Sequence, residues 1–258
     1  MQQVEQIETD VAMRPDKTIS NAPKSSGTVR LALIVVVIVI ALIAAGAAYI
    51  WFSGGNGEAS ATITAPSLEL QPGDTRGLFR IDADGSEARF IIDEILLGEP
   101  KTVVGTTNEV AGEILIDLEN PANSVLGVIR INVRTLETDN EFRNRALRGQ
   151  ILQADRPEYE FATFTPIMLN TLPQTVTVGE PFDFQIVGSL NLHGVSRDVT
   201  FDATVTPVSD SQITGTARTV VQYRDFGMSI PEAAGVAGIS DDVRLEIDFN
   251  AQANSETR

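Results

Sequence analysis

An uninterrupted apolar run from Leu31 to Phe52 constrains this chain more than any other feature. The run contains no charged residue, and as a helix rising about 1.5 Å per residue it would be roughly 33 Å long, enough to cross the hydrocarbon core of a bilayer. A helix buried in a soluble core would be shorter and would show a polar stripe. Tyr49 and Trp51 lie near its end, as in the aromatic belt of membrane proteins. The sequence therefore predicts one transmembrane helix over 31–52.

The charges that flank this run predict its orientation. The leader, residues 1–30, carries four basic residues, and no Lys or Arg follows the run until Arg76. Because Lys and Arg concentrate on the cytoplasmic side, we expect a cytoplasmic N-terminus and an extracytoplasmic domain, in the periplasm or at the cell surface. A secretory signal cleaved at Ala59-Ser60-Ala61 is the alternative, but a long apolar run after a 30-residue, partly acidic leader favours a retained anchor.

The formal net charge of −16 argues against one class of partner. Acidic and basic residues balance in the leader, so the whole excess of negative charge lies beyond the apolar run. Such a surface repels phosphate backbones, and we therefore expect no nucleic acid partner. The chain also has no cysteine, which excludes disulfides, thiol nucleophiles and cysteine metal sites.

Beyond the run, composition predicts a flexible Gly-, Ser-, Ala- and Pro-rich linker over 53–77, one domain over 78–254 and a short tail over 255–258. Apolar and polar residues alternate along much of the domain. Since successive side chains of a strand point to opposite faces, this period of two predicts half-buried antiparallel strands. The alternating segments are Phe90–Ile92, Ile114–Leu118, Ile129–Val133, Tyr159–Phe161, Phe182–Leu190, Val199–Val205 and Val243–Phe249.

One segment departs from this alternation and predicts a helix. Thr138 and Glu141 have the spacing of a capping box, and Phe142 and Leu147 follow before Gly149, which is a typical helix terminator. We expect a short amphipathic helix of about ten residues here. The eight or so strands must hide their edges by closing into a barrel or by pairing two sheets, and the alternation alone leaves both arrangements open.

Three segments of the domain resemble the YceI family of lipid-binding, lipocalin-like proteins. Their order and spacing agree with that family over roughly residues 78–252. The chain has Thr135 where the family more often has Ser, and Arg224 lies one residue later than usual, while 171–181 resembles an insertion. The three segments are NVRTLET (Asn132–Thr138) with the FRNRALRGQIL that follows, VGSLNLHGVS (Val187–Ser196) and YRDFGM (Tyr223–Met228).

The resemblance implies a mainly β fold, an antiparallel lipocalin-like β-barrel of about eight strands with a short capping helix. Its apolar interior would hold an isoprenoid, such as a quinone or polyprenyl lipid, or a fatty acyl chain, without a covalent cofactor. With the transmembrane helix, this implies a membrane-tethered binding protein whose partners are the bilayer and an isoprenoid-type lipid. The residues expected to bind the ligand are Ile131, Val133, Phe161, Phe184, Ile186, Leu190, His193, Phe201, Val205, Tyr223, Arg224, Phe226 and Phe249.

Two other functions remain open from the residues themselves. An eight-stranded barrel is narrow enough to be filled by side chains, so the same apolar residues would also suit a structural or stress-related envelope module without a ligand. Polar candidates for the mouth are the arginines of the short helix, His193, which could instead hold a turn, and Arg224 with Asp225, which could form a local ion pair. A lipid-modifying enzyme with His193 as base is the third function, but no motif exposes a serine nucleophile and one histidine cannot make a histidine-rich metal site. We therefore predict no catalytic residue and no metal ligand.

Overall fold

The computed structural model describes residues 26–53, 55 and 57–253. They fall into two compact units that divide between Ala45 and Gly46, and each unit is described by itself. Helix α1 (Ser26–Ser53) contains the whole predicted apolar run, and by length and composition it could cross a membrane. Most of the expected polar leader, 1–25, and the expected tail, 255–258, lie outside the described residues.

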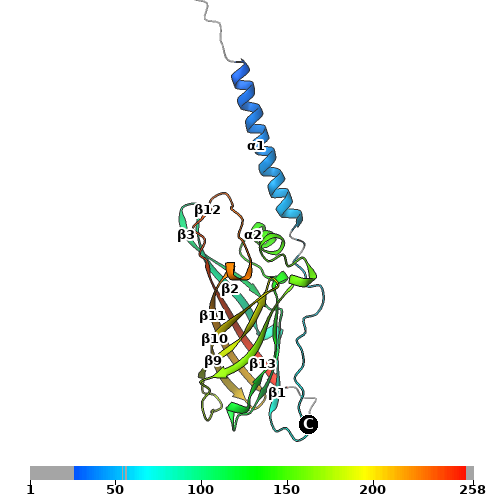
Figure 1. Ribbon diagram of the computed structural model, residues 1–258, viewed down its shortest axis with the longest axis vertical. Coiled ribbons are helices and arrows are strands. Elements are labelled where there is room, and N and C mark those ends of the chain that lie inside the picture. Colours follow the sequence, from blue (N-terminus) through cyan, green and yellow to red (C-terminus); the bar gives the residue numbers. More distant parts are fainter. Residues whose placement is uncertain (1–25, 54, 56, 254–258) are drawn as a thin grey trace, which may run out of the picture. The chain divides into compact units, whose positions relative to one another are not determined.

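The domain is one antiparallel sheet that curls into a barrel (Figure 1). Its spatial order is β4-β7-β8-β9-β10-β11-β13-β1-β5-β6, and β2 pairs with β13, β3 and β12. The strands are β1 (Gly77–Ile81), β2 (Glu87–Leu96), β3 (Glu99–Thr107), β4 (Val110–Ala111), β5 (Glu113–Ile116), β6 (Val125–Leu126), β7 (Ile129–Asn132), β8 (Phe161–Asn170), β9 (Phe182–Leu192), β10 (Val195–Ser209), β11 (Gln212–Gln222), β12 (Val236–Ala237) and β13 (Asp242–Ala253).

The barrel is closed by a chain segment that is divided into several short strands. β3, β4 and β5 follow one another closely, and this segment pairs with β2 and β1 on one side and with β7 on the other. It therefore joins the two ends of the sheet, so the fold is the predicted lipocalin-like barrel. The helical elements are α2 (Glu141–Ala146), the π-helical turn η4 (Leu147–Ile151) and the 3-10 turns η1 (Ala83–Gly85), η2 (Pro121–Asn123), η3 (Val133–Thr135), η5 (Pro157–Tyr159) and η6 (Tyr223–Phe226).

The alternation seen in the sequence determines which side chains face the interior. On β10, Phe201 and Ala203 pack in the main hydrophobic cluster, while the hydroxyl of Thr204 donates to Asp183 on the neighbouring strand at 2.6 Å. Across from β8, Gly188 leaves room for the ring of Phe164, because a Cβ there would lie 2.4 Å from Phe164 Cζ. Strand periodicity therefore separates a continuous apolar interior from a polar outer face.

Hydrogen bonds from local side chains set the start of α2 and the end of β7 at positions that differ from those expected. The backbone N–H and hydroxyl of Thr138 both donate to Asn144 Oδ1 at 2.7 Å, so Asn140 rather than Thr138 caps α2. The helix then widens into η4 and continues past the expected end at Gly149. The strand expected to reach Val133 ends one residue earlier, where the Asn132 side chain accepts from the backbone of η3.

The segment between α1 and the barrel differs from the flexible linker that composition suggests. Residues 57–76, which we call the strap, have no regular secondary structure, but they are bonded to the barrel. The backbone N–H and hydroxyl of Ser60 donate to the Glu160 carboxylate at 2.9 and 2.6 Å. Further along, the Leu68 N–H donates to Glu113 at 2.7 Å. Gly and Ser indicate flexibility only where nothing binds the backbone, and here two buried carboxylates bind it.

Glu160 is the most strongly bonded of these carboxylates. It is 1% exposed, accepts from the Asn132 amide at 3.1 Å and pairs with Arg134 at 3.2 Å, in addition to its two bonds from Ser60. Burial raises the pKa of the Glu160 carboxyl, but the bonds from Ser60, the charge of Arg134 and the Asn132 amide outweigh it. The pKa of Glu160 therefore lies below its ordinary value of 4.5.

This lowered pKa predicts how the strap responds to acid. The stability that ionised Glu160 contributes is fully present above about pH 4.5 and is lost as the pH falls through the lowered pKa. The loss of unfolding free energy in Glu160→Gln, measured by urea denaturation, should therefore be large at pH 7 and should shrink steadily below pH 4.5. An equal loss at pH 7 and pH 3 would show that the ionised form has no special role.

Candidate functional site

The barrel contains an apolar cavity of about 380 Å³. This volume lies within the range of small-molecule sites, roughly 300–1,000 Å³. Nine of the thirteen residues predicted to bind a ligand line it, because they occupy inward positions on their strands or at the start of the adjoining turn. They are Ile131, Val133, Phe184, Ile186, Leu190, Phe201, Val205, Tyr223 and Phe249.

Two of the other predicted residues are apolar but lie away from the cavity wall. Phe161 begins β8 on the outside, where the Arg130 guanidinium lies 4.0 Å from the centroid of its ring. Phe226 is 1% exposed and packs within the hydrophobic cluster rather than on the wall. The apolar character of Phe226 correctly indicated a buried side chain. The apolar character of Phe161 suggested an inward position, but this residue lies on the outer face of β8.

Arg224 also lies away from the cavity. Its side chain is largely exposed, and its Nε donates to Asp241 at 2.7 Å. One expected role of Arg224 was a local ion pair with Asp225. In the structure Arg224 instead forms an ion pair with Asp241, in the loop that leads to β13. In this position Arg224 joins η6 to the start of β13 and does not contact the apolar interior.

His193 belongs to a tight turn. It forms the two-residue connection between β9 and β10 with Gly194, and both residues have positive φ, +53° and +75°, as a type I′ hairpin requires. Its ring lies 4.7 Å from that of Tyr159, and Nδ1 lies 3.4 Å from the carbonyl oxygen of Phe226. These contacts place the imidazole beside η6 and outside the cavity wall.

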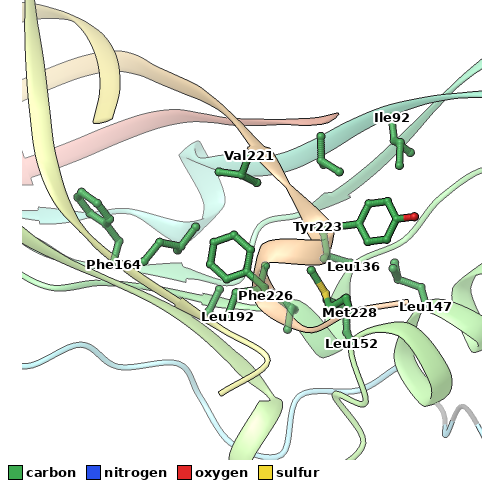
Figure 2. Packing of buried hydrophobic residues seen from close by; sticks show 14 of the residues in the cluster. Ile92, Leu136, Leu147, Leu152, Phe164, Leu192, Val221, Tyr223, Phe226 and Met228 are labelled. Atoms are coloured by element: carbon green, nitrogen blue, oxygen red, sulfur yellow. The ribbon is translucent and has the colours of Figure 1, made fainter. Parts of the chain in front are cut away.

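One end of the cavity is covered by helical turns. Leu147 and Leu152 come from η4 and the residue after it, and they pack against Tyr223 and Met228 from η6 and the following loop (Figure 2). The amphipathic segment predicted from the sequence therefore caps the barrel with its apolar side. Ile230 and Ile239, from the loop between η6 and β13, complete this wall and were not predicted.

Two charged side chains interrupt the apolar wall at the α2 end. Glu94 follows Phe90 and Ile92 at inward positions of β2 and is only 8% exposed. Arg143 of α2 also lines the cavity, and its Nη2 donates to Glu94 Oε1 at 2.9 Å. Arg143 was among the predicted arginines of the mouth, whereas Glu94 was missed. The signal was present in the sequence, because Glu94 places a charge at an inward position of an alternating strand.

The opposite end of the cavity includes residues that the sequence assigned to an insertion. Leu172 and Val176, in the connection between β8 and β9, contribute apolar side chains to it. Asp117 and Ser124 lie there too, but the Asp117 carboxylate accepts from the backbone of Asn120 at 2.8 Å, which is the main cause of its lowered pKa. Its hydrogen bonds hold the turn around η2.

Comparison with known proteins agrees with this architecture. The model of the YceI-like domain matches residues 79–251. Curated relatives include proteins named UPF0312 from Yersinia pestis and Yersinia pseudotuberculosis, each 26% identical over 128 residues, which is 50% of this chain. The chain spans 61% of the length of these relatives.

Two solved structures share the fold. A polyisoprenoid-binding domain from Saccharophagus degradans, implicated in plant cell wall breakdown, aligns over 68% of this chain and 98% of its own, with a TM-score of 0.53 and 18% identity. BcnA from Burkholderia cenocepacia aligns over 67% of this chain and 99% of its own, with a TM-score of 0.52 and 16% identity. Since the family model matches more than half of the chain, the chain belongs to the YceI-like family.

Proposed function

We propose that this chain is a membrane-tethered, extracytoplasmic binding protein that holds an isoprenoid-type or other long-chain lipid inside its barrel. The observation that carries the proposal is the apolar cavity of about 380 Å³. A barrel whose side chains filled its interior would leave no such volume, so the cavity favours a lipid-binding protein over a structural module with a solid core. The polyisoprenoid-binding domain from Saccharophagus degradans, as its name describes it, supports the same class of ligand.

Among the described residues, the position of the histidine that was considered as a base favours binding over catalysis. His193 lies in a turn outside the cavity wall, and the hydroxyl of Ser196, close to it in sequence, bonds to Asn191 rather than to the imidazole ring. Within residues 26–253 as far as they are described, no group of three or more His, Asp or Glu could hold a metal ion. A lipid-modifying enzyme that used covalent catalysis would need a nucleophile and a base within hydrogen-bond reach of each other beside the ligand.

The strap supports a location close to the membrane. The sequence has only residues 54–59 between the end of α1 and Ser60, which is bonded to Glu160 on the barrel. Six residues of extended chain reach at most about 20 Å. A barrel on so short a tether would meet membrane lipids at high local concentration, and it would suit local loading, storage or transfer better than diffusion between distant membranes.

The source of the ligand determines what must drive its binding. Removing a methylene group from water gains about 0.8 kcal/mol, but a lipid that leaves a bilayer moves from one apolar phase to another. Shape and contacts to the polar end of the lipid must then supply the net affinity. Any selectivity should therefore come from the charged groups at the wall rather than from its apolar side chains.

Mass spectrometry of organic extracts from the purified full-length chain tests the proposal. We expect about one long-chain lipid per chain, enriched over the lipids of the host membrane, because the cavity inside the barrel is apolar and about 380 Å³ in volume. A fragment of residues 1–56, which keeps α1 without the barrel, identifies lipids that the helix alone carries. If the full chain carries no lipid beyond those of this fragment, the proposal is wrong.

A further inference from the structure

The Glu94 carboxylate leaves one oxygen without a donor inside the cavity. Glu94 Oε1 accepts from Arg143 Nη2 at 2.9 Å, whereas none of the described residues donates to Oε2. The residue is only 8% exposed, and it lines a mainly apolar wall together with Arg143. The other charged residues of the wall are Asp117 and the mutually paired Arg89 and Glu246. Oε2 is not one of the fully buried polar atoms without a partner among the described residues, so it keeps accessible surface that a ligand in the cavity can reach. A carboxylate oxygen accepts hydrogen bonds only, so this site favours a ligand that supplies a donor.

The charge of Arg143 is already balanced. Its Nη1 pairs with Asp139 while its Nη2 pairs with Glu94, so one guanidinium lies between two carboxylates. Asp139 in turn pairs with Lys101. These four groups sum to zero charge, and no positive charge remains in the cluster for an anionic ligand. The two bonds use only two of the five N–H donors of Arg143, so donors remain for a neutral acceptor.

We propose that the polar end of the bound lipid is an uncharged hydrogen-bond donor, such as the hydroxyl of an isoprenoid alcohol or phenol, and that Glu94 and Arg143 receive it. This inference rests on the proposed function and names the ligand class for the same cavity. A hydroxyl donates to Glu94 Oε2 and accepts from a remaining N–H of Arg143, so it satisfies both groups. An isoprenoid diphosphate would instead place several negative charges beside Glu94.

The surroundings strengthen this discrimination. Glu94 and Arg143 lie in a wall made mainly of apolar side chains, and a like-charge contact at a partly buried site is screened less than in water. The other arginines of this segment are committed elsewhere, because Arg145 pairs with Glu141 at 2.9 Å and neither Arg145 nor Arg148 lines the cavity. The carboxylate of Glu94 therefore acts as a specificity determinant against anionic lipids.

Competition between two ligands of equal chain length tests the proposal. The full-length chain in detergent is given geranylgeraniol and geranylgeranyl diphosphate at equal concentration, and native mass spectrometry counts each bound form. We expect the alcohol to exceed the diphosphate by at least tenfold in the wild type. In Glu94→Gln the repulsion is removed, and the ratio should move toward the diphosphate by at least tenfold. Both proteins share one micelle composition, so partitioning into detergent cancels in this comparison.

Glu113→Gln is the matched control, because Glu113 is also buried and paired with an arginine, Arg80, but lies outside the cavity. It should leave the ratio unchanged. Equal or preferred binding of the diphosphate by the wild type would overturn the inference while leaving lipid binding intact, and it needs no variant to fold. An unchanged ratio in a folded Glu94→Gln would overturn it too. Binding of neither ligand would overturn the inference, whereas the proposed function is decided separately by the lipids extracted from the full-length chain.

Discussion

Replacing Glu160 by alanine should lower the free energy of unfolding of the barrel by about 3–5 kcal/mol at pH 7. The substitution removes one member of a buried ion pair and leaves the charge of the other without a counterion. Glu160 is 1% exposed and accepts from Ser60 and Asn132 while pairing with Arg134. The alanine variant leaves the Arg134 guanidinium with little compensation and removes the acceptor for both bonds of Ser60. The expected loss is therefore larger than that of one hydrogen bond, about 1 kcal/mol.

Urea denaturation of the full-length chain measures this loss. Glu158→Ala is the matched control, since Glu158 lies two residues away in η5, is exposed and makes no bond to the strap in the described structure. Its effect should stay within about 0.5 kcal/mol. Proteolysis provides a second measurement, because release of Ser60 should make cleavage within 57–76 faster in Glu160→Ala than in the control. Equal stability and equal cleavage of the two variants would contradict the role assigned to Glu160.

The strands and the inward residues could be predicted because they follow from a simple period. Phe184, Phe201 and Phe249 lie at alternate positions, and alternation places a side chain on one face whatever the rest of the fold does. The apolar helix was equally clear, since an uncharged apolar run of this length is typical of membrane-spanning helices and rare in soluble domains. Closure of the sheet into a barrel came from the family resemblance, because the period of a strand does not say which strands become neighbours.

Polar residues were harder to place because their role depends on distant partners. Glu160 and Ser60 are 100 residues apart, and nothing in a Gly- and Ser-rich segment indicates that a buried carboxylate binds it. Arg224 was expected at the ligand because the segment YRDFGM resembles the YceI family, but its exposed side chain pairs with Asp241. An ion pair costs little to rearrange at a surface, so sequence neighbours are poor guides to it.

Glu94 is the exception that the sequence could have revealed. It continues the inward series of Phe90 and Ile92. A charge at such a position indicates either that the strand register was assigned wrongly or that the charged group has a function inside the barrel. The structure excludes a slipped register, because β2 pairs with β3 without a break from Ala88 to Leu96. The break in the apolar pattern could therefore have identified a polar element of the cavity from the sequence alone.

Filling the cavity should abolish lipid binding without unfolding the barrel. Ala203 and Ala217 face each other across β10 and β11, both are buried, and both line the cavity. In Ala203→Phe/Ala217→Phe two rings would occupy one cross-section of the interior. We expect lipid recovered per chain to fall by at least tenfold, a loss of about 1.4 kcal/mol or more in binding free energy. Because the rings enter existing space, overpacking should cost less than the roughly 1–3 kcal/mol typical of a filled core.

The neighbouring register pair provides a control with the same chemistry on the other face. Thr204 and Thr216 pair directly beside the two alanines, and their side chains point to the outside of the barrel. Thr204→Phe/Thr216→Phe should therefore retain its lipid, measured by the same extraction and mass spectrometry. If the inward variant, still folded by circular dichroism, carries as much lipid as the outward one, the ligand lies outside the barrel. If both variants lose it equally, the loss comes from the added aromatic surface and not from the cavity, since only one pair of side chains reaches the interior.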